Sequence, residues 1–137
     1  MKKQLLTLLA MVTMTVVPLQ MRADDIPING TTFPDANFRN WVLAQDYGQD
    51  GVLTEAEIAG VTSMYVSNKN IASLKGIEYF TALTDLNCGY NLLTSLDVSG
   101  CTALLYIDCE SNQLTSLDVS DCTALGGFSC SFNQLLS

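Results

Sequence analysis

The second half of the chain repeats itself. Residues 83–103 read LTDLNCGYNLLTSLDVSGCTA and residues 104–124 read LLYIDCESNQLTSLDVSDCTA, and thirteen of these 21 positions are identical. A third copy begins at Leu125, and a diverged 22-residue copy occupies residues 61–82. One repeat of this length cannot bury its apolar side alone, so successive copies stack on one another and form a solenoid.

The copies from residue 83 onward follow the pattern L-x-x-L-x-C-x-x-N-x-L, with Ile107 and Phe128 at its second apolar position, and the diverged copy matches it at apolar positions only. The pattern is typical of a leucine-rich repeat with cysteine at one apolar position. The alternation around Leu86, Asn87 and Cys88 predicts a short strand with Leu86 and Cys88 facing inward. In the segment that follows, we expect Leu96 and Val98 to point inward. The predicted fold class is an α/β leucine-rich-repeat solenoid with short parallel strands and a small helical cap at its N-terminal end.

The repeats also align polar and sulfur-containing side chains in columns. An asparagine that follows each strand can both donate and accept hydrogen bonds, so we expect it to satisfy a buried backbone bend. Cysteines of exported proteins often form disulfides, but here their odd number and side-by-side placement favour free, buried thiols. No C-x-x-C spacing supports a zinc or redox site. The asparagines are Asn91, Asn112 and Asn133, and the cysteines are Cys88, Cys101, Cys109, Cys122 and Cys130.

The N-terminus has the pattern of a secretory signal. Lys2 and Lys3 precede an apolar run over residues 5–17, and Ala23 offers a cleavage point. The run is shorter than the roughly 20 residues needed to span a bilayer. We therefore expect export, a secreted or cell-surface location and no transmembrane segment in the mature chain. The predicted domains are a signal peptide at 1–23, a helical cap at 24–60 and leucine-rich repeats at 61–137 with an incomplete last coil.

Composition excludes several classes of function. The chain contains no histidine, which removes Ser-His-Asp triads and imidazole metal sites. Its formal charge is −8, and without residues 1–23 three basic residues face fourteen acidic ones, a charge of −11. Such a surface repels phosphate backbones, so nucleic acid and anionic membranes are not expected partners.

The full repeat unit, L-x-x-L-x-C-x-x-N-x-L-T-S-L-D-V-S-x-x-T-A-L, resembles the cysteine-containing leucine-rich repeats of internalin-J-like bacterial surface proteins. Repeats of this kind occur in secreted proteins of Bacteroidetes. The resemblance is close over residues 61–137 and looser over 33–60. It implies a curved solenoid used for adhesion or recognition, and it implies no enzymatic activity.

Two features of residues 31–60 predict a helical cap with a loop resembling an EF hand. Thr32 to Asp35 fits a capping box, and Phe38, Trp41 and Val42 fall on one helical face. The segment DYGQDGVLTEAE at 46–57 then follows the spacing of a calcium-binding loop, except that its third position is a glycine without a side-chain oxygen. The candidate calcium ligands are Asp46, Asp50, the Val52 carbonyl, Thr54 and Glu57.

A second interpretation of this loop needs no metal. Thr54 and Glu57 have the spacing of a capping box for a helix at 55–59, and Asp46 and Asp50 can be ordinary loop residues. Calcium at this loop is the one cofactor that the sequence suggests, and both interpretations remain open at this stage. In either case the unit covers the open end of the solenoid, as terminal repeats require.

The favoured function is a non-enzymatic, extracellular module that binds a protein or glycan ligand in adhesion or recognition. The candidate surface is the outward row of strand residues, where tyrosines mix with carboxylates and amides. The alternative is a truncated fragment of a larger leucine-rich-repeat surface protein with only a structural role. A glycosidase needs a cleft around its carboxyl pair, which a short open solenoid does not offer. The candidate ligand-binding residues are Tyr65, Ser67, Asp85, Asn87, Tyr106, Asp108, Glu110 and Ser129.

Overall fold

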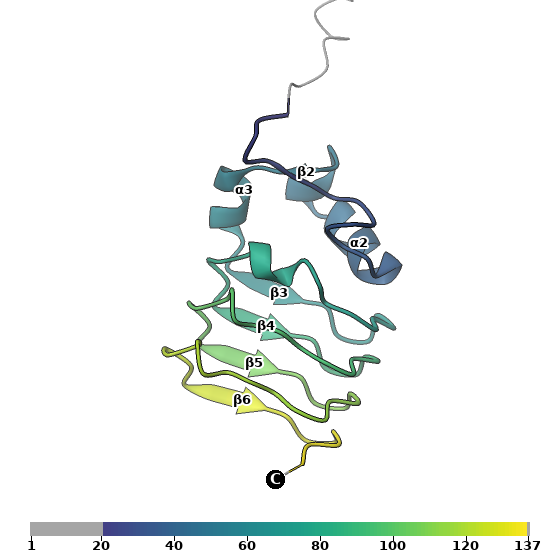
Figure 1. The fold of residues 1–137 in the computed structure, drawn as a ribbon, viewed down its shortest axis with the longest axis vertical. Helices are drawn as coiled ribbons and strands as arrows, with labels where there is room; N and C mark the ends of the chain where they lie inside the picture. Colours follow the sequence, from purple (N-terminus) through teal and green to yellow (C-terminus); the bar gives the residue numbers. More distant parts are fainter. Residues whose placement is uncertain (1–20, 137) are drawn as a thin grey trace, which may run out of the picture.

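Four short parallel strands stacked along one side of a solenoid organise the molecule (Figure 1). The computed structural model describes residues 21–136. Most of the predicted signal peptide, 1–23, lies outside the described residues. The strands are β3 (Ser63–Tyr65), β4 (Asp85–Asn87), β5 (Tyr106–Asp108) and β6 (Gly127–Ser129), in that order across the sheet.

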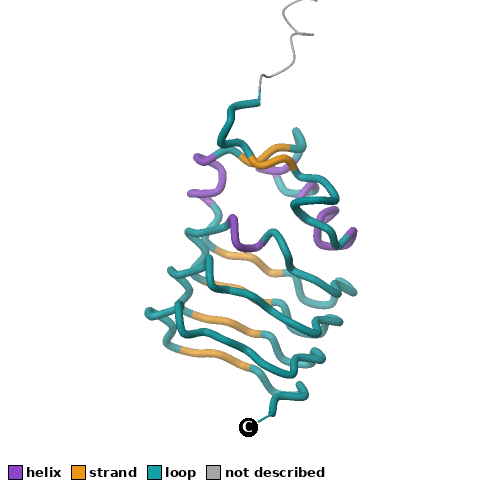
Figure 2. Tube along the Cα trace, viewed as in Figure 1, coloured by secondary structure: helices purple, strands orange, loops and turns teal. Residues whose placement is uncertain are grey.

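The register of the sheet follows the sequence repeat. Met64 lies opposite Leu86, Leu86 opposite Ile107, and Ile107 opposite Phe128, so each strand is offset by one repeat from the next. The predicted leucine-rich-repeat solenoid is therefore confirmed. Figure 2 shows the strands aligned on one side, with mostly loop on the return path of each coil.

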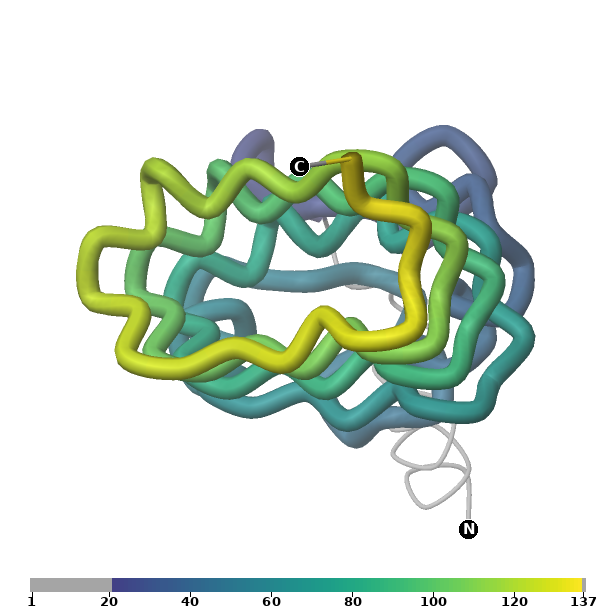
Figure 3. Tube along the Cα trace, turned by 90° about the horizontal axis from the view of Figure 1, so that it is seen from below, coloured from purple at the N-terminus to yellow at the C-terminus, as the bar shows by residue number. Residues whose placement is uncertain are grey.

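Each coil forms a flattened ring, and successive rings lie over one another when the molecule is seen along the stack (Figure 3). On the return path Leu96 and Val98 are buried while Asp97 and Ser99 are exposed, as the alternation predicts. A parallel bridge joins Asp97 to Asp118 of the next coil. The rings thus stay in contact on the side opposite the sheet as well.

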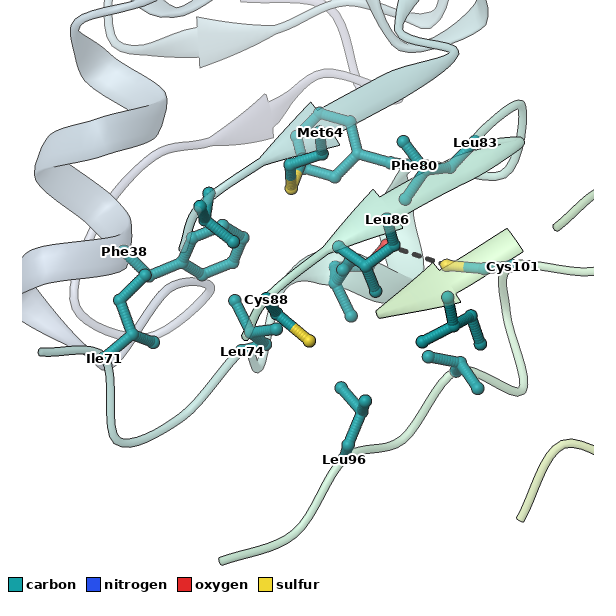
Figure 4. Close-up of a cluster of buried hydrophobic side chains, with 14 of the residues drawn as sticks. Phe38, Met64, Ile71, Leu74, Phe80, Leu83, Leu86, Cys88, Leu96 and Cys101 are labelled. Atoms are coloured by element: carbon teal, nitrogen blue, oxygen red, sulfur yellow. Dashed lines mark hydrogen bonds between the residues drawn. The ribbon is translucent and has the colours of Figure 1, made fainter. Parts of the chain in front are cut away.

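The core fills the inside of the rings with aliphatic, aromatic and sulfur-containing side chains (Figure 4). Leu86 in β4 and Cys88, which lies just after this strand, are fully buried, as expected from the alternation. The Cys101 thiol donates to the Ile77 carbonyl, which lies in a short 3-10 helix over Ile77–Tyr79. Stacking therefore gives each coil an apolar interior that no single coil could shield.

An asparagine ladder closes the bend after β4, β5 and β6. The Asn91 amide oxygen accepts from the Lys69 and Ile71 backbone N–H groups at 3.0 and 3.1 Å, and its amide nitrogen donates to the Val66 and Cys88 carbonyls at 2.8 and 3.0 Å. Asn112 and Asn133 repeat this pattern one and two coils later. The predicted structural role of these residues is confirmed.

The five cysteines are free thiols, four of them buried and Cys130 partly exposed. Burial raises the pKa of the Cys101 thiol to about 12 and that of Cys109 to about 11, and it raises the pKa of Cys88 and Cys122 as well. These thiols therefore act as small core side chains rather than as nucleophiles.

The N-terminal end of the stack is covered by a small cap. Its elements are β1 (Ile26–Pro27), α2 (Ala36–Leu43), a 3-10 helix (Asp46–Gly48), β2 (Val52–Leu53) and α3 (Glu55–Gly60). Phe38 and Val42 of α2 are fully buried and Trp41 packs against the core. The predicted Thr32 capping box is wrong: the N-cap is Asp35, which accepts from the Phe38 N–H at 2.9 Å, because the Thr32 hydroxyl donates to the Pro27 carbonyl instead.

Polar and aromatic contacts fix the cap to the first coil. The second carboxylate oxygen of Asp35 accepts from the Ala72 and Ser73 backbone N–H groups at 2.9 and 3.2 Å. The centroids of the Phe33 and Phe80 rings lie 6.4 Å apart. Gly76, at φ +108°, allows this approach, because a Cβ at that position would collide with the Phe33 ring.

No helix among residues 21–136 combines the length and apolar character needed to cross a membrane.

Candidate functional site

The outward side chains of the four strands form two columns across the sheet. One column runs Ser63, Asp85, Tyr106 and Gly127, and the other runs Tyr65, Asn87, Asp108 and Ser129. Backbone hydrogen bonds between neighbouring coils continue past the strand ends. If alternation is followed along them, Ser67 and Glu110 lie on the same side. We call this surface the strand face, and its members are Ser63, Tyr65, Ser67, Asp85, Asn87, Tyr106, Asp108, Glu110, Gly127 and Ser129.

All eight residues predicted from the sequence lie on the strand face, because the sheet keeps strict alternation through four strands. Tyr65 and Tyr106 project from it, with 63% and 42% of their surface exposed. The polar side chains between them, such as Asn87 and Asp108, are only half-buried. The result is an open surface on which two aromatic rings stand above amides and carboxylates.

Neutral donors hold the carboxylates of the strand face. Asp85 accepts from the Thr84 hydroxyl at 2.8 Å, and Asp108 accepts from the Asn87 amide at 3.4 Å. Glu110 accepts from the Ser129 hydroxyl, also at 3.4 Å. The first bond lies within one strand segment and the other two join neighbouring coils, and all three orient the side chains without neutralising their formal charge.

A third column, which the sequence analysis missed, borders the strand face where each chain segment turns inward. Asn68, Tyr90, Ser111 and Phe132 occupy matching positions there, and all have a left-handed backbone with φ between 52° and 56°. Tyr90 and Phe132 are 53% and 80% exposed. Left-handed backbone is unfavourable for an aromatic residue, and Tyr90 and Phe132 each adopt it directly before a ladder asparagine whose side chain bonds to the surrounding backbone.

A signal for this column does exist in the sequence. Tyr90, Ser111 and Phe132 each directly precede a ladder asparagine, at the position where strand alternation stops. Alternation alone places such a residue on neither face, and only the bend geometry turns it outward. The Glu110 carboxylate beside the Tyr90 hydroxyl raises the pKa of that phenol, so the third column is in contact with the strand face.

The candidate calcium ligands of the cap are spread over separate local contacts. Asp50 accepts from the Val52 backbone N–H at 3.0 Å, and Asp46 accepts from the Gln49 amide at 3.3 Å. Thr54 and Glu57 form both halves of a capping box for α3, as predicted. Within residues 21–136, no three acidic or cysteine side chains gather in a way that could hold a metal ion.

The missing ligand of the calcium pattern has a steric cause. Gly48 is buried, and a Cβ at this position would collide with the carbonyl group of Val42 at the end of α2. Glycine is therefore required for the close approach of the loop to the helix. Asp46 and Glu57 line one open hollow of about 340 Å³, in which they are the only two carboxylates among the lining residues. The geometry favours the capping interpretation of this loop.

Comparison with known proteins agrees with the fold and the repeats. No family model matches the chain. Over 68 residues it is 41% identical to internalin J of Listeria monocytogenes, a match that covers 49% of this chain and 7% of the relative. The chain thus spans a small part of the length of that curated relative.

Solved structures show the same similarity. The functional domain of internalin J from Listeria monocytogenes, described as including a cysteine ladder, matches 87% of this chain and 26% of its own, with a TM-score of 0.73 and 34% identity. An internalin from the same species, inlF, matches 86% of this chain and 36% of its own, with a TM-score of 0.69 and 24% identity, which supports the fold alone. The repeats of this chain are therefore internalin-J-like leucine-rich repeats.

Proposed function

We propose that the chain is an exported module that binds a partner protein through the strand face and has no catalytic role. The observation that carries this proposal is the exposure of Tyr65 and Tyr106 on a rigid, uniformly paired sheet. Large exposed aromatic side chains are enriched where proteins bind one another. The export pattern at residues 1–23 supports a secreted or cell-surface location.

The sheet supplies a rigid platform for such an interface. The strand residues of the face are held by backbone pairing, on both sides in β4 and β5 and on one side in β3 and β6, and bonds such as that from Asn87 to Asp108 orient the side chains further. Binding therefore requires little ordering of the surface, which reduces the entropic cost of association. Tyrosine adds large contact area with few rotatable bonds.

A glycan is the rival ligand, since tyrosines and carboxylates also suit sugar hydroxyls. Asp108 and Glu110 stand on an open sheet rather than in a cleft, and this favours binding over glycoside hydrolysis. We assign the site to a protein because internalin-like similarity and exposed tyrosines both point to a protein interface.

The proposal can be tested by selecting binders from a displayed random-peptide library and measuring their affinity for the wild-type chain and its variants. Peptides that occupy the strand face should bind Tyr106→Ala at least about tenfold more weakly than wild type, as expected for an interface aromatic. Asp97→Ala changes an exposed residue on the return path and serves as the matched control. It should leave affinity within about twofold.

The proposal would be overturned if the selected peptides bound Tyr65→Ala and Tyr106→Ala with the same affinity as wild type. A glycan array provides the second arm of the test. Glycan binding that is lost in Tyr106→Ala, without any peptide binding that depends on Tyr106, would assign the surface to a sugar and contradict a protein partner.

A further inference from the structure

The charge of the solenoid is entirely of one sign beyond its first coil. No lysine, arginine or histidine follows Lys75, and seven acidic residues do, so residues 76–137 carry a formal charge of −7. Three of these seven lie on the strand face. They are Asp85, Asp108 and Glu110, contributed by β4 and by β5 with the residues just after it.

Two of these acidic side chains, Asp108 and Glu110, lie near the same glycine of β4's following bend. A Cβ built on Gly89, which is buried between them, would lie 3.4 Å from an Asp108 carboxylate oxygen and 3.5 Å from the Glu110 Cγ. Both side chains therefore lie over the same stretch of backbone. With only neutral hydrogen-bond donors around them, their mutual repulsion is relieved best by a cation from outside.

Aromatic rings stand beside each carboxylate. Tyr106 lies directly opposite Asp85 in the register, and it is two residues before Asp108 on the same side of β5. Tyr90 lies next to Glu110 at the border of the strand face. A guanidinium or ammonium group that stacks on either ring is therefore within reach of a carboxylate, an arrangement that combines a cation–π contact with an ion pair.

We propose that the partner segment recognised by the strand face is rich in arginine and lysine. This inference rests on the proposed function and specifies the chemistry of the partner. Arginine fits best, because its planar fork can pair with the Asp108 and Glu110 carboxylates while its flat side lies on Tyr106 or Tyr90. Acidic partners are repelled by the same charges.

The positions of the basic residues along the stack indicate which strands a basic partner segment contacts. Lys69 follows β3, and it and Lys75 are the only basic residues at 61–137. The charged residues thus change from mixed sign near the cap to purely acidic at β4 and β5, and β6 itself carries no charged residue. A basic segment is expected to contact β4 and β5 most closely.

The test uses two synthetic peptides of equal length, one alternating arginine and serine and the other alternating glutamine and serine. The arginine peptide should bind wild type at least about tenfold more tightly than the glutamine peptide. Its affinity should fall steeply as salt rises from about 0.05 to 0.5 M, because the Debye length shortens.

Matched variants separate the strand face from overall charge. Asp108→Asn with Glu110→Gln removes two charges from the strand face, and Asp97→Asn with Asp118→Asn removes two from the return path. We expect the first pair to weaken arginine-peptide binding about tenfold and the second to change it less than about twofold. Tyr106→Phe should retain binding and Tyr106→Ala should weaken it.

The outcomes distinguish this inference from the proposed function. Equal weakening by the two double variants would mean that only net charge is sensed, and would overturn the basic-partner assignment. Library peptides that depend on Tyr106 but lack arginine and lysine would also overturn it while leaving the proposed function intact. If no selected peptide depends on the strand face, the proposed function itself falls.

Discussion

The two ends of the solenoid carry the same sequence pattern in different surroundings. Near the cap, Leu86 and Cys88 are fully buried, and their counterparts one coil later, Ile107 and Cys109, are buried as well. In the last described coil the matching Phe128 is 56% exposed. The residue at this repeat position is apolar in every coil, but only in the inner coils is it shielded from water.

The difference shows that burial in this fold comes from the neighbouring coil and not from the repeat itself. At the N-terminal end, α2 and the Phe33 ring supply the missing neighbour and complete the core. Beyond β6 no described residue does so. The same substitution should therefore have a cost that depends on its place in the stack, as expected for solenoids with nearest-neighbour energetics.

The largest difference between the two ends is expected for apolar truncation. Leu86→Ala should lower the free energy of unfolding by about 2–5 kcal/mol, because it leaves a cavity in a sealed core. Phe128→Ala should cost about 1 kcal/mol or less despite removing a larger side chain, since its ring is mostly in water. Urea unfolding of both variants measures the contrast.

The exposed Asp97 provides a baseline for this comparison, and Asp97→Ala should stay within about 0.5 kcal/mol of wild type. Equal costs for Leu86→Ala and Phe128→Ala would show that something covers the last coil in solution.

A smaller contrast is expected along the asparagine ladder. Asn112→Ala leaves the buried Leu93 N–H without its partner and removes one of two amide donors from the Cys88 and Cys109 carbonyls, so it should cost about 2–3 kcal/mol. Asn133→Ala removes the same kinds of bond where water can replace them, and should cost about 1 kcal/mol. Thermal unfolding followed by circular dichroism compares the two, and a cost for Asn133→Ala as large as that for Asn112→Ala would contradict the contrast.

Thiol chemistry gives a third contrast, between Cys109 and Cys130. Burial raises the pKa of the Cys109 thiol from an ordinary 9.0 to about 11, so in the native chain it should resist a thiol reagent that reacts with Cys130. Mass spectrometry should find one rapidly labelled thiol in native protein and five in denatured, unreduced protein. A denatured chain with fewer than four reactive thiols would reveal a disulfide.

The same shift predicts a pH dependence. Because the folded chain holds the Cys109 proton more tightly than the unfolded chain, its contribution to stability is complete below pH 9 and decreases as the pH rises toward about 11. Cys109→Ala should flatten the fall in the urea midpoint over this range. An unchanged pH profile in that variant would assign the loss to other groups.

The smallest effect is expected at the cap, which we infer is held by packing and hydrogen bonds without a metal. Glu57→Gln can still complete the capping box with Thr54, so the free energy of unfolding should change by less than about 0.5 kcal/mol. Several millimolar calcium should leave the melting midpoint of both proteins unchanged. A midpoint that rises with calcium in wild type but not in Glu57→Gln would establish the calcium loop instead.

The parts of the structure that were predictable are those set by local periodicity. The 21-residue period placed Leu86 and Ile107 in register, and alternation within each strand separated inward from outward side chains. The position of each asparagine after a strand was enough to predict its role. Period and alternation are both visible in the order of the residues, so one sequence contains all the information they need.

The failures involve contacts that neither the repeat period nor strand alternation describes. Thr32 matched a capping pattern, but the Pro27 carbonyl takes its hydroxyl and Asp35 becomes the cap. The steric need for Gly48 depends on how closely its loop approaches α2, which spacing alone does not report. Tyr90 reaches the border of the strand face at a left-handed turn, which strand alternation does not predict.

By itself the sequence determined the solenoid, the inward and outward sides of its strands and the one-signed charge beyond Lys75, because all three follow from repeat period and composition. Tertiary structure alone decided how much of each apolar column is hidden, from fully buried Leu86 to exposed Phe128. It also decided that Tyr90, which strand alternation does not place, reaches Glu110 of the next coil. The physical reason is that burial and proximity are properties of stacked coils, and a coil has neither until the next one packs against it.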